Sequence, residues 1–157
     1  MISMPTWVVV TAVVLVIVAL LGLWAMGTAN RLNRLHIRTD AARINLEGAL
    51  AARGHVIKAL YPQLTKEVMN AEIVPLRAVD MGHRTDSENH VLSLLPTEIF
   101  HNPAFVEAST RVDIAARFYN DAVANTLAVR KRPDVRLLRL AGNAPLPKYY
   151  EALSAGE

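Results

Sequence analysis

The chain has 157 residues, of which 52% are hydrophobic and 20% are charged, whereas a globular chain is usually about 45–50% apolar and about 25% charged. The first 30 residues contain no Asp, Glu, Lys or Arg, so every charged residue lies in the remainder. This uneven distribution excludes a plain soluble protein, and the charged remainder excludes a polytopic membrane protein. The absence of cysteine excludes disulfide scaffolds, thiolate metal sites and cysteine nucleophiles.

Residues 7–26 form an apolar run in which Thr11 is the one hydroxyl-bearing residue. A helix of 20 residues is about 30 Å long, which matches the hydrocarbon core of a bilayer. Trp7 and Trp24 lie near the two ends of the run, where indole rings prefer the level of the lipid headgroups. The sequence therefore predicts a transmembrane anchor over residues 1–30.

A cleaved signal peptide is the competing interpretation of this run. Signal peptides begin with basic residues and contain a hydrophobic stretch of about 7–15 residues. Here no Lys or Arg precedes the run, and the run itself is longer. These two differences favour an uncleaved anchor.

The basic residues next to the anchor predict its orientation. None precedes the apolar run, whereas Arg31, Arg34 and Arg38 follow it closely. Because basic residues concentrate on the cytoplasmic side of a membrane, we expect an outside N-terminus, a cytoplasmic C-terminal part and a bacterial inner membrane. The same three arginines are expected to contact anionic lipid headgroups at the membrane face.

Beyond the anchor, apolar residues recur at spacings of three, four and seven. They are Leu32, Leu35, Ala42, Leu46, Ala49, Val56 and Leu60. No proline interrupts this stalk before Pro62, so the pattern predicts one continuous helix from the anchor to about Tyr61. A stripe this narrow must be covered by other helices.

The middle of the chain is divided by helix-breaking residues. A second helix is expected from a cap at Thr65, and Pro75 should divide it. Residues 82–86 are expected to form a turn. Thr85 and Glu88 have the spacing of a capping box, which predicts that Glu88 lies in the exposed first turn of the next helix.

The last long helix is expected to run from Pro103 to about Arg130, with Asn102 as its cap. Its apolar stripe consists of Phe105, Ala108, Val112, Ala116, Tyr119 and Val123. No segment alternates with period two for long enough to predict a strand. We therefore expect an all-α fold in which residues 31–132 form an antiparallel cytoplasmic helical bundle that includes the stalk.

The C-terminal tail, residues 133–157, differs from the bundle in composition. It begins at a proline, and residues 141–147 cannot continue a helix. One interpretation is a frayed terminus. The alternative is an extended peptide that docks on a partner through Leu146, Tyr149 and Tyr150, because free termini seldom carry so many large apolar groups.

The densest basic cluster consists of Arg130, Lys131, Arg132, Arg136 and Arg139. Nucleic acid is not expected as its partner, because no aromatic residue lies among these side chains and the chain is membrane-bound. A solvated or lipid-facing turn and a contact with an acidic partner surface are the remaining interpretations.

No motif predicts an enzyme. The five histidines are His36, His55, His83, His90 and His101, and none forms a His-x-x-x-His pair. The sequence also lacks glycine-rich phosphate loops and serine nucleophile motifs. We therefore expect no catalytic residues, no cofactor and no metal.

Residues 115–123, Ala-Ala-Arg-Phe-Tyr-Asn-Asp-Ala-Val, resemble the LemA family, whose late-helix pattern Tyr-Asn-x-x-Val matches Tyr119, Asn120 and Val123. The resemblance implies a short membrane anchor with an outside N-terminus, a cytoplasmic bundle of long helices and no agreed enzymatic activity. Residues 62–102 depart from the smoothly helical middle of that family.

The three matching residues also have a structural interpretation of their own. Tyr119 lies on the apolar stripe and should bury its ring while its hydroxyl finds a partner. Asn120 is a poor helix former in the middle of a helix, so we expect its side chain to hydrogen-bond to a neighbouring helix. A binding site at these residues is the alternative.

Together these features predict a non-catalytic accessory subunit of a larger membrane complex, with integral membrane proteins as partners. By analogy alone, it looks like the small subunits of bacterial respiratory assemblies such as cytochrome oxidase supercomplexes. The alternative is a stand-alone LemA-like adaptor that self-associates through the stalk stripe. A third hypothesis is an enzyme that holds a metal with His83, His90 and His101.

Overall fold

Helix α1, Thr6–Leu60, runs without a break from the anchor into the bundle. The computed structural model describes residues 5–137 and 145–151, and within these ranges it contains helices and no strands. The remaining elements are η1 (Pro62–Leu64), α2 (Thr65–Ile73), α3 (Met81–Ser93), η2 (Thr97–His101), α4 (Pro103–Arg130) and α5 (Pro133–Leu137). The all-α bundle expected from the sequence is confirmed.

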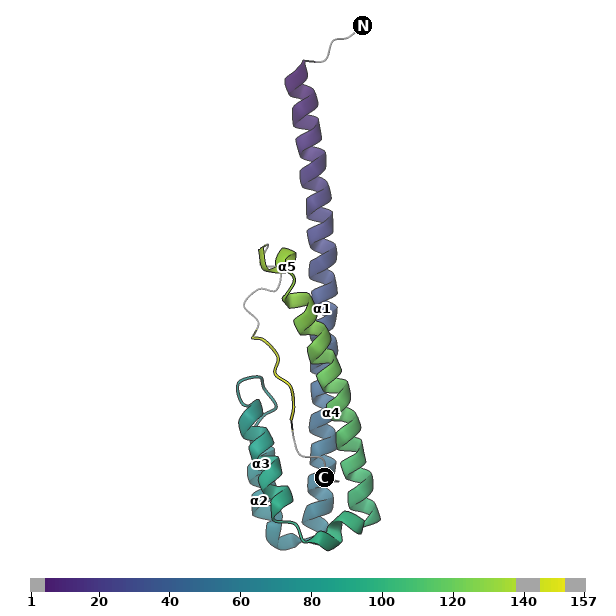
Figure 1. The fold of residues 1–157 in the computed structure, drawn as a ribbon, viewed down its shortest axis with the longest axis vertical. Helices are drawn as coiled ribbons and strands as arrows, with labels where there is room; N and C mark the ends of the chain where they lie inside the picture. Colours follow the sequence, from purple (N-terminus) through teal and green to yellow (C-terminus); the bar gives the residue numbers. More distant parts are fainter. Residues whose placement is uncertain (1–4, 138–144, 152–157) are drawn as a thin grey trace.

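The first half of α1 stands apart from the rest of the chain (Figure 1). It is the one helix of the described part that is long and apolar enough to cross a membrane, and none of its most apolar stretch is buried against other residues. Its length and composition are those of a helix that can span a bilayer. The continuous helix through anchor and stalk therefore agrees with the sequence-based expectation.

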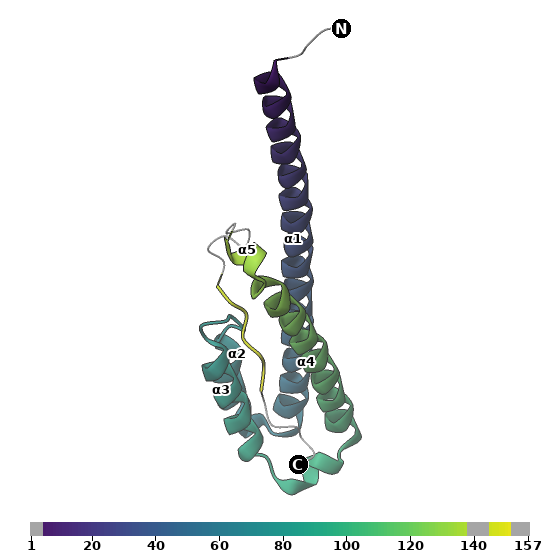
Figure 2. The same ribbon diagram turned by 45° about the horizontal axis from the view of Figure 1, so that its top comes forward.

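Helix α4 packs antiparallel on the second half of α1 and forms the main interface of the bundle (Figures 1 and 2). The buried residues of α4 alternate at spacings of three and four. They include Phe105, Ala108, Val112, Ala115, Tyr119, Ala122, Thr126 and Val129. This period of 3.5 keeps one side of α4 against α1 along its whole length, as in a coiled coil. The expected cap is confirmed, because the Asn102 side chain accepts hydrogen bonds from the backbone of Ala104 and Phe105.

One buried polar pair lies in the α1–α4 interface. The hydroxyl oxygens of Thr39 and Thr126 are 2.9 Å apart, and the Thr39 hydroxyl is also 3.0 Å from the carbonyl of Leu35 in its own helix. A buried hydroxyl without a partner is costly. A shift of α4 along α1 would separate this pair, so the pair favours the observed register.

The hairpin of α2 and α3 covers only the end of the bundle farthest from the anchor (Figure 1). Helix α2 crosses close to α1 at Gly54, where a Cβ atom added to the glycine would stand 2.7 Å from the Glu72 carboxylate. That carboxylate accepts hydrogen bonds at 3.0 and 3.1 Å from Lys58. Gly54 thus permits the close approach that the Lys58–Glu72 ion pair requires.

The prediction of a turn over residues 82–86 was wrong, because α3 already begins at Met81 and contains this whole stretch. Its buried positions include Met81, Arg84 and Glu88 at helical spacing. Two of these three are charged, so a hydrophobic pattern counts them as surface. The prediction that Glu88 lies in an exposed first turn was wrong for the same reason.

A buried cluster of charges joins α3 to α1 and α2. The Glu88 carboxylate accepts hydrogen bonds from Arg53 of α1 at 3.0 Å and from Arg84 of α3 at 2.9 Å. Arg84 also donates to the carbonyl of Val74, at 2.7 Å, beyond the last turn of α2. Arg53 is only 2% exposed. One carboxylate is therefore shared by two guanidinium groups that are removed from water, and it compensates one of their two positive charges.

Replacing Glu88 by Gln is expected to lower the free energy of unfolding by about 3 kcal/mol, because two buried arginines lose their carboxylate. The matched control is Glu47→Gln, which breaks a half-exposed pair with Arg43 and should cost less than about 0.5 kcal/mol. Denaturant unfolding of both variants in detergent, followed by circular dichroism, measures the difference. Equal losses in the two variants would contradict the assigned role of the buried cluster.

Candidate functional site

The C-terminal segment 145–151 lies along α4 on the side of α3, as an extended strap (Figures 1 and 2). Three side chains of α4, those of Arg130, Tyr119 and Asn120, donate hydrogen bonds to its backbone. Arg130 Nη1 lies 3.0 Å from the carbonyl of Pro145, and the Tyr119 hydroxyl lies 2.9 Å from the carbonyl of Lys148. These hydrogen bonds hold the strap by its main chain.

The Asn120 side chain makes the most specific contact with the strap. Its amide nitrogen donates to the carbonyl of Tyr150 at 2.9 Å, and its amide oxygen accepts from the backbone N–H of Tyr150 at 2.9 Å. This two-way pairing resembles one rung of a sheet ladder. It corrects the expectation that Asn120 bonds to a neighbouring helix, because the partner is the strap, 30 residues away.

Tyr150 carries the strap into the core of the bundle. Its side chain is 4% exposed and packs in the same apolar cluster as Leu46, Leu50 and Met81. The sequence analysis proposed that Tyr150 anchors the tail on a partner, but its ring is buried in the core of its own bundle. Leu146 and Tyr149, the other two proposed anchors, are exposed to solvent.

Burial gives the Tyr150 hydroxyl unusual properties. It has no hydrogen-bond partner within the described residues. Desolvation, followed by the charge of Glu88, raises the pKa of Tyr150 well above its ordinary value. Desolvation also raises the pKa of Tyr119. Both phenol groups are therefore neutral while the strap is docked.

The other residues of the resemblance behave as the packing interpretation expects. Tyr119 is buried, and its hydroxyl has found a partner. Val123 is completely buried in the apolar cluster of the α1–α4 interface. The motif thus has one member that fills the core and two that hold the strap.

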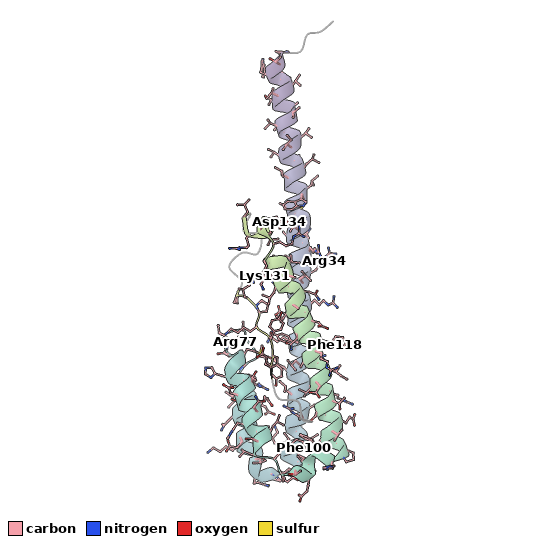
Figure 3. All side chains as sticks on the ribbon, in the orientation of Figure 1. Arg34, Arg77, Phe100, Phe118, Lys131 and Asp134 are labelled. Atoms are coloured by element: carbon pink, nitrogen blue, oxygen red, sulfur yellow. The ribbon has the colours of Figure 1, made fainter. Side chains whose placement is uncertain are left out.

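An apolar groove lies between α1 and α4 on the side opposite to α2 and α3. It is lined by Ile44, Gly48, Ala52, Ile114 and Phe118, among others. Ile44 is 61% and Phe118 is 62% exposed, and Figure 3 shows Phe118 on α4, away from the α2–α3 hairpin. We call the exposed side chains of Ile37, Ile44, Ile114 and Phe118, with this groove, the open face.

The stalk stripe, by contrast, is not available for self-association. Three of its members, Leu32, Leu46 and Ala49, are buried inside the bundle. This burial corrects the expectation that a second copy would pack on that stripe. The open face lies on other residues of the same helix.

The residues expected at the membrane all lie on α1. Trp7 and Trp24 are exposed near the two ends of the apolar stretch of α1. Arg31, Arg34 and Arg38 are exposed on the next turns of the same helix. Of the second basic cluster, Lys131, Arg132 and Arg136 are exposed, whereas Arg139 lies outside the described residues.

The described residues contain no group of three or more His, Asp or Glu side chains that could hold a metal ion. A separate cavity lies beside the strap, lined by His36, Asp40, Arg43, Tyr119 and Pro147, among others.

The sequence analysis missed the buried charges of Arg53, Arg84 and Glu88 near Tyr150. The available signal was Arg53, which lies seven residues after Leu46 and four before Ile57 on an otherwise apolar face.

Comparison of the chain with protein-family models, with curated proteins and with solved structures found no match.

The strap is expected to leave the bundle as pH rises above about 10. A raised pKa in the docked state means that docking is fully stable below the ordinary tyrosine pKa of 10.0 and weakens above it. Because the chain has no cysteine, a fluorophore on Tyr149→Cys reports docking by its anisotropy. Adding Tyr150→Phe should keep the strap docked to higher pH, because only Tyr119 then contributes to the pH dependence of docking.

Asn120→Ala is the companion variant, and its strap should be more mobile already at neutral pH. Two hydrogen bonds are lost, at about 1 kcal/mol each. Asn125→Ala, an exposed position on the same helix, is the matched control and should not change the anisotropy. An unchanged pH midpoint in Tyr150→Phe, or an unchanged anisotropy in Asn120→Ala, would contradict the assigned contacts.

Proposed function

We propose that this chain is a non-catalytic, single-pass membrane protein that serves as an accessory subunit of a larger membrane complex. The observation that supports this function most strongly is the open face, a set of exposed large apolar side chains beside an apolar groove between α1 and α4. Isolated apolar residues are normal on a protein surface, but a contiguous apolar patch favours a protein partner.

The composition of the open face fits a helix of a membrane-protein partner. Small residues, Gly48 and Ala52, line the groove together with the large apolar residues Ile44, Ile114 and Phe118. Small residues allow a second backbone to approach closely, and exposed aromatic rings are common anchors of protein interfaces. Part of the face lies on α1, the helix that continues into the anchor, which favours a partner held in the same membrane.

The orientation proposed for the protein follows from charge. Arg31, Arg34 and Arg38 follow the apolar stretch directly, which supports an outside N-terminus and a bundle on the cytoplasmic side of a bacterial inner membrane. By analogy with small subunits of respiratory assemblies, a cytochrome oxidase supercomplex is the first candidate partner to examine.

The alternative is a LemA-like adaptor that self-associates. Tyr119, Asn120 and Val123 carry that resemblance. With the stalk stripe buried, the open face would have to form the contact between two copies. The same experiment on Phe118 separates the two functions.

Phe118→Glu is expected to reduce recovery of the membrane partner by about 30-fold in mild detergent, because a buried aromatic anchor of an interface contributes about 2 kcal/mol or more. Val106→Glu is the control, since Val106 is an exposed apolar residue near the start of the same helix. Mass spectrometry of the co-purified proteins measures recovery.

A photo-reactive residue in place of Phe118 identifies the occupant. The proposal predicts a cross-linked product with a different membrane protein. A product of two copies of this chain alone would support the self-associating adaptor. Unchanged partner recovery in Phe118→Glu would show that the open face is not the docking site.

A further inference from the structure

Helix α5 is packed against the membrane end of the stalk. Val129 and Val135, on either side of the α4–α5 turn, form a small core with Leu32 of α1, and all three are buried. Figures 1 and 2 both show α5 beside α1, at the end of the bundle nearest the apolar stretch. The tail therefore begins with an ordered helix, although the sequence predicted a break at Pro133.

This packing brings two distant basic segments to one level. Residues 130–137 contain four basic residues and one acidic residue, Asp134, and Arg132 pairs with that carboxylate at 2.8 Å. Figure 3 shows Lys131 at nearly the same height along the bundle as Arg34 of α1. The basic residues of the α4–α5 turn thus lie beside the arginines that follow the anchor and enlarge the positively charged region there.

The basic side chains of this region lie within reach of the lipid headgroups. Leu32 lies six residues beyond Met26, the end of the apolar run, which is about 9 Å along the helix. The polar layer of a bilayer is about 5–8 Å thick on each side of the hydrocarbon core, so the backbone at Leu32 lies just outside it, and long Lys and Arg side chains extend into it. Leu137, at the end of α5, is 84% exposed, and a large apolar side chain beside basic residues is typical of helices that lie in this layer.

We propose that the α4–α5 turn and the arginines of α1 form a binding site for anionic phospholipid headgroups. Lys131 and Arg136 contact the headgroup phosphates, and Leu137 enters the boundary with the acyl chains. The site gives the protein a second contact with the membrane and limits the tilt of the bundle. This inference depends on insertion of α1 in the proposed function but not on any partner complex.

Full-length protein in lipid nanodiscs tests the site. A fluorophore on Leu137→Cys is unique, because the chain has no other cysteine. Trace lipids with a nitroxide group in the headgroup region quench it when they are adjacent. We expect stronger quenching by nitroxide-labelled phosphatidylglycerol than by nitroxide-labelled phosphatidylcholine. The same label on Val106→Cys, 24 residues before Arg130 and hence about 36 Å away along α4, should not be quenched.

The double replacement Lys131→Gln and Arg136→Gln is expected to lower the preference for the anionic lipid by about 25-fold, since each cation near an anionic surface contributes about fivefold. Arg117→Gln, an exposed arginine farther down α4, is the matched control. Equal quenching by the two lipids in the unmodified chain, or a preference that survives the double replacement, would overturn the site.

Failure of the anchor is detected in the same sample. Both tryptophans of the chain, Trp7 and Trp24, lie in the anchor, so their intrinsic fluorescence is quenched by nitroxide lipids if α1 is inserted. Quenched tryptophans with an unquenched label at position 137 would reject the headgroup site alone. Unquenched tryptophans would reject membrane insertion and the site together.

Discussion

Antiparallel packing of α4 on α1 positions the other features of this chain. Because α1 is continuous with the anchor, whatever α4 carries at its C-terminal end is returned toward the membrane (Figure 1). The antiparallel direction of α4 places Val135 against Leu32. It also brings the basic residues of the α4–α5 turn to the level of the first arginines of α1. The same packing buries the stalk stripe and leaves Ile44 and Phe118 together on the outside. The proposed headgroup site at the α4–α5 turn and the open face thus both follow from the packing of α4 on α1.

The strap covers part of the α1–α4 core that α2 and α3 leave open. Helices α2 and α3 have 9 and 13 residues, against 28 in α4, so they cover only part of the α1–α4 pair. Tyr150 fills the remaining gap above the charge cluster of Glu88, and Asn120 secures its backbone. Burial of Tyr150 lowers the exposure of the core to water, which strengthens the nearby ion pairs. The strap is therefore a structural part of the fold.

Regular apolar spacing made α1 and α4 predictable, and Asn102 before Pro103 marked where α4 begins. The α2–α3 hairpin was harder to predict, because Arg84 and Glu88 face the core within a buried charge cluster and a hydrophobic pattern counts such residues as surface. Tyr119 and Asn120 were recognised as a motif, but their partner was not. It lies 29 and 30 residues away in an extended segment without periodicity, and only the packed bundle shows the gap that the segment fills.

The α1–α4 register is tested most directly by a pair of cysteines at Thr39 and Thr126, whose hydroxyl oxygens are 2.9 Å apart. In a chain without other cysteines, mild oxidation in the membrane should give nearly complete disulfide formation within one chain. The pair Ile44→Cys and Thr126→Cys is the control and should not react. Absence of the Thr39–Thr126 crosslink, or its formation only between two copies, would contradict the antiparallel packing on which the account depends.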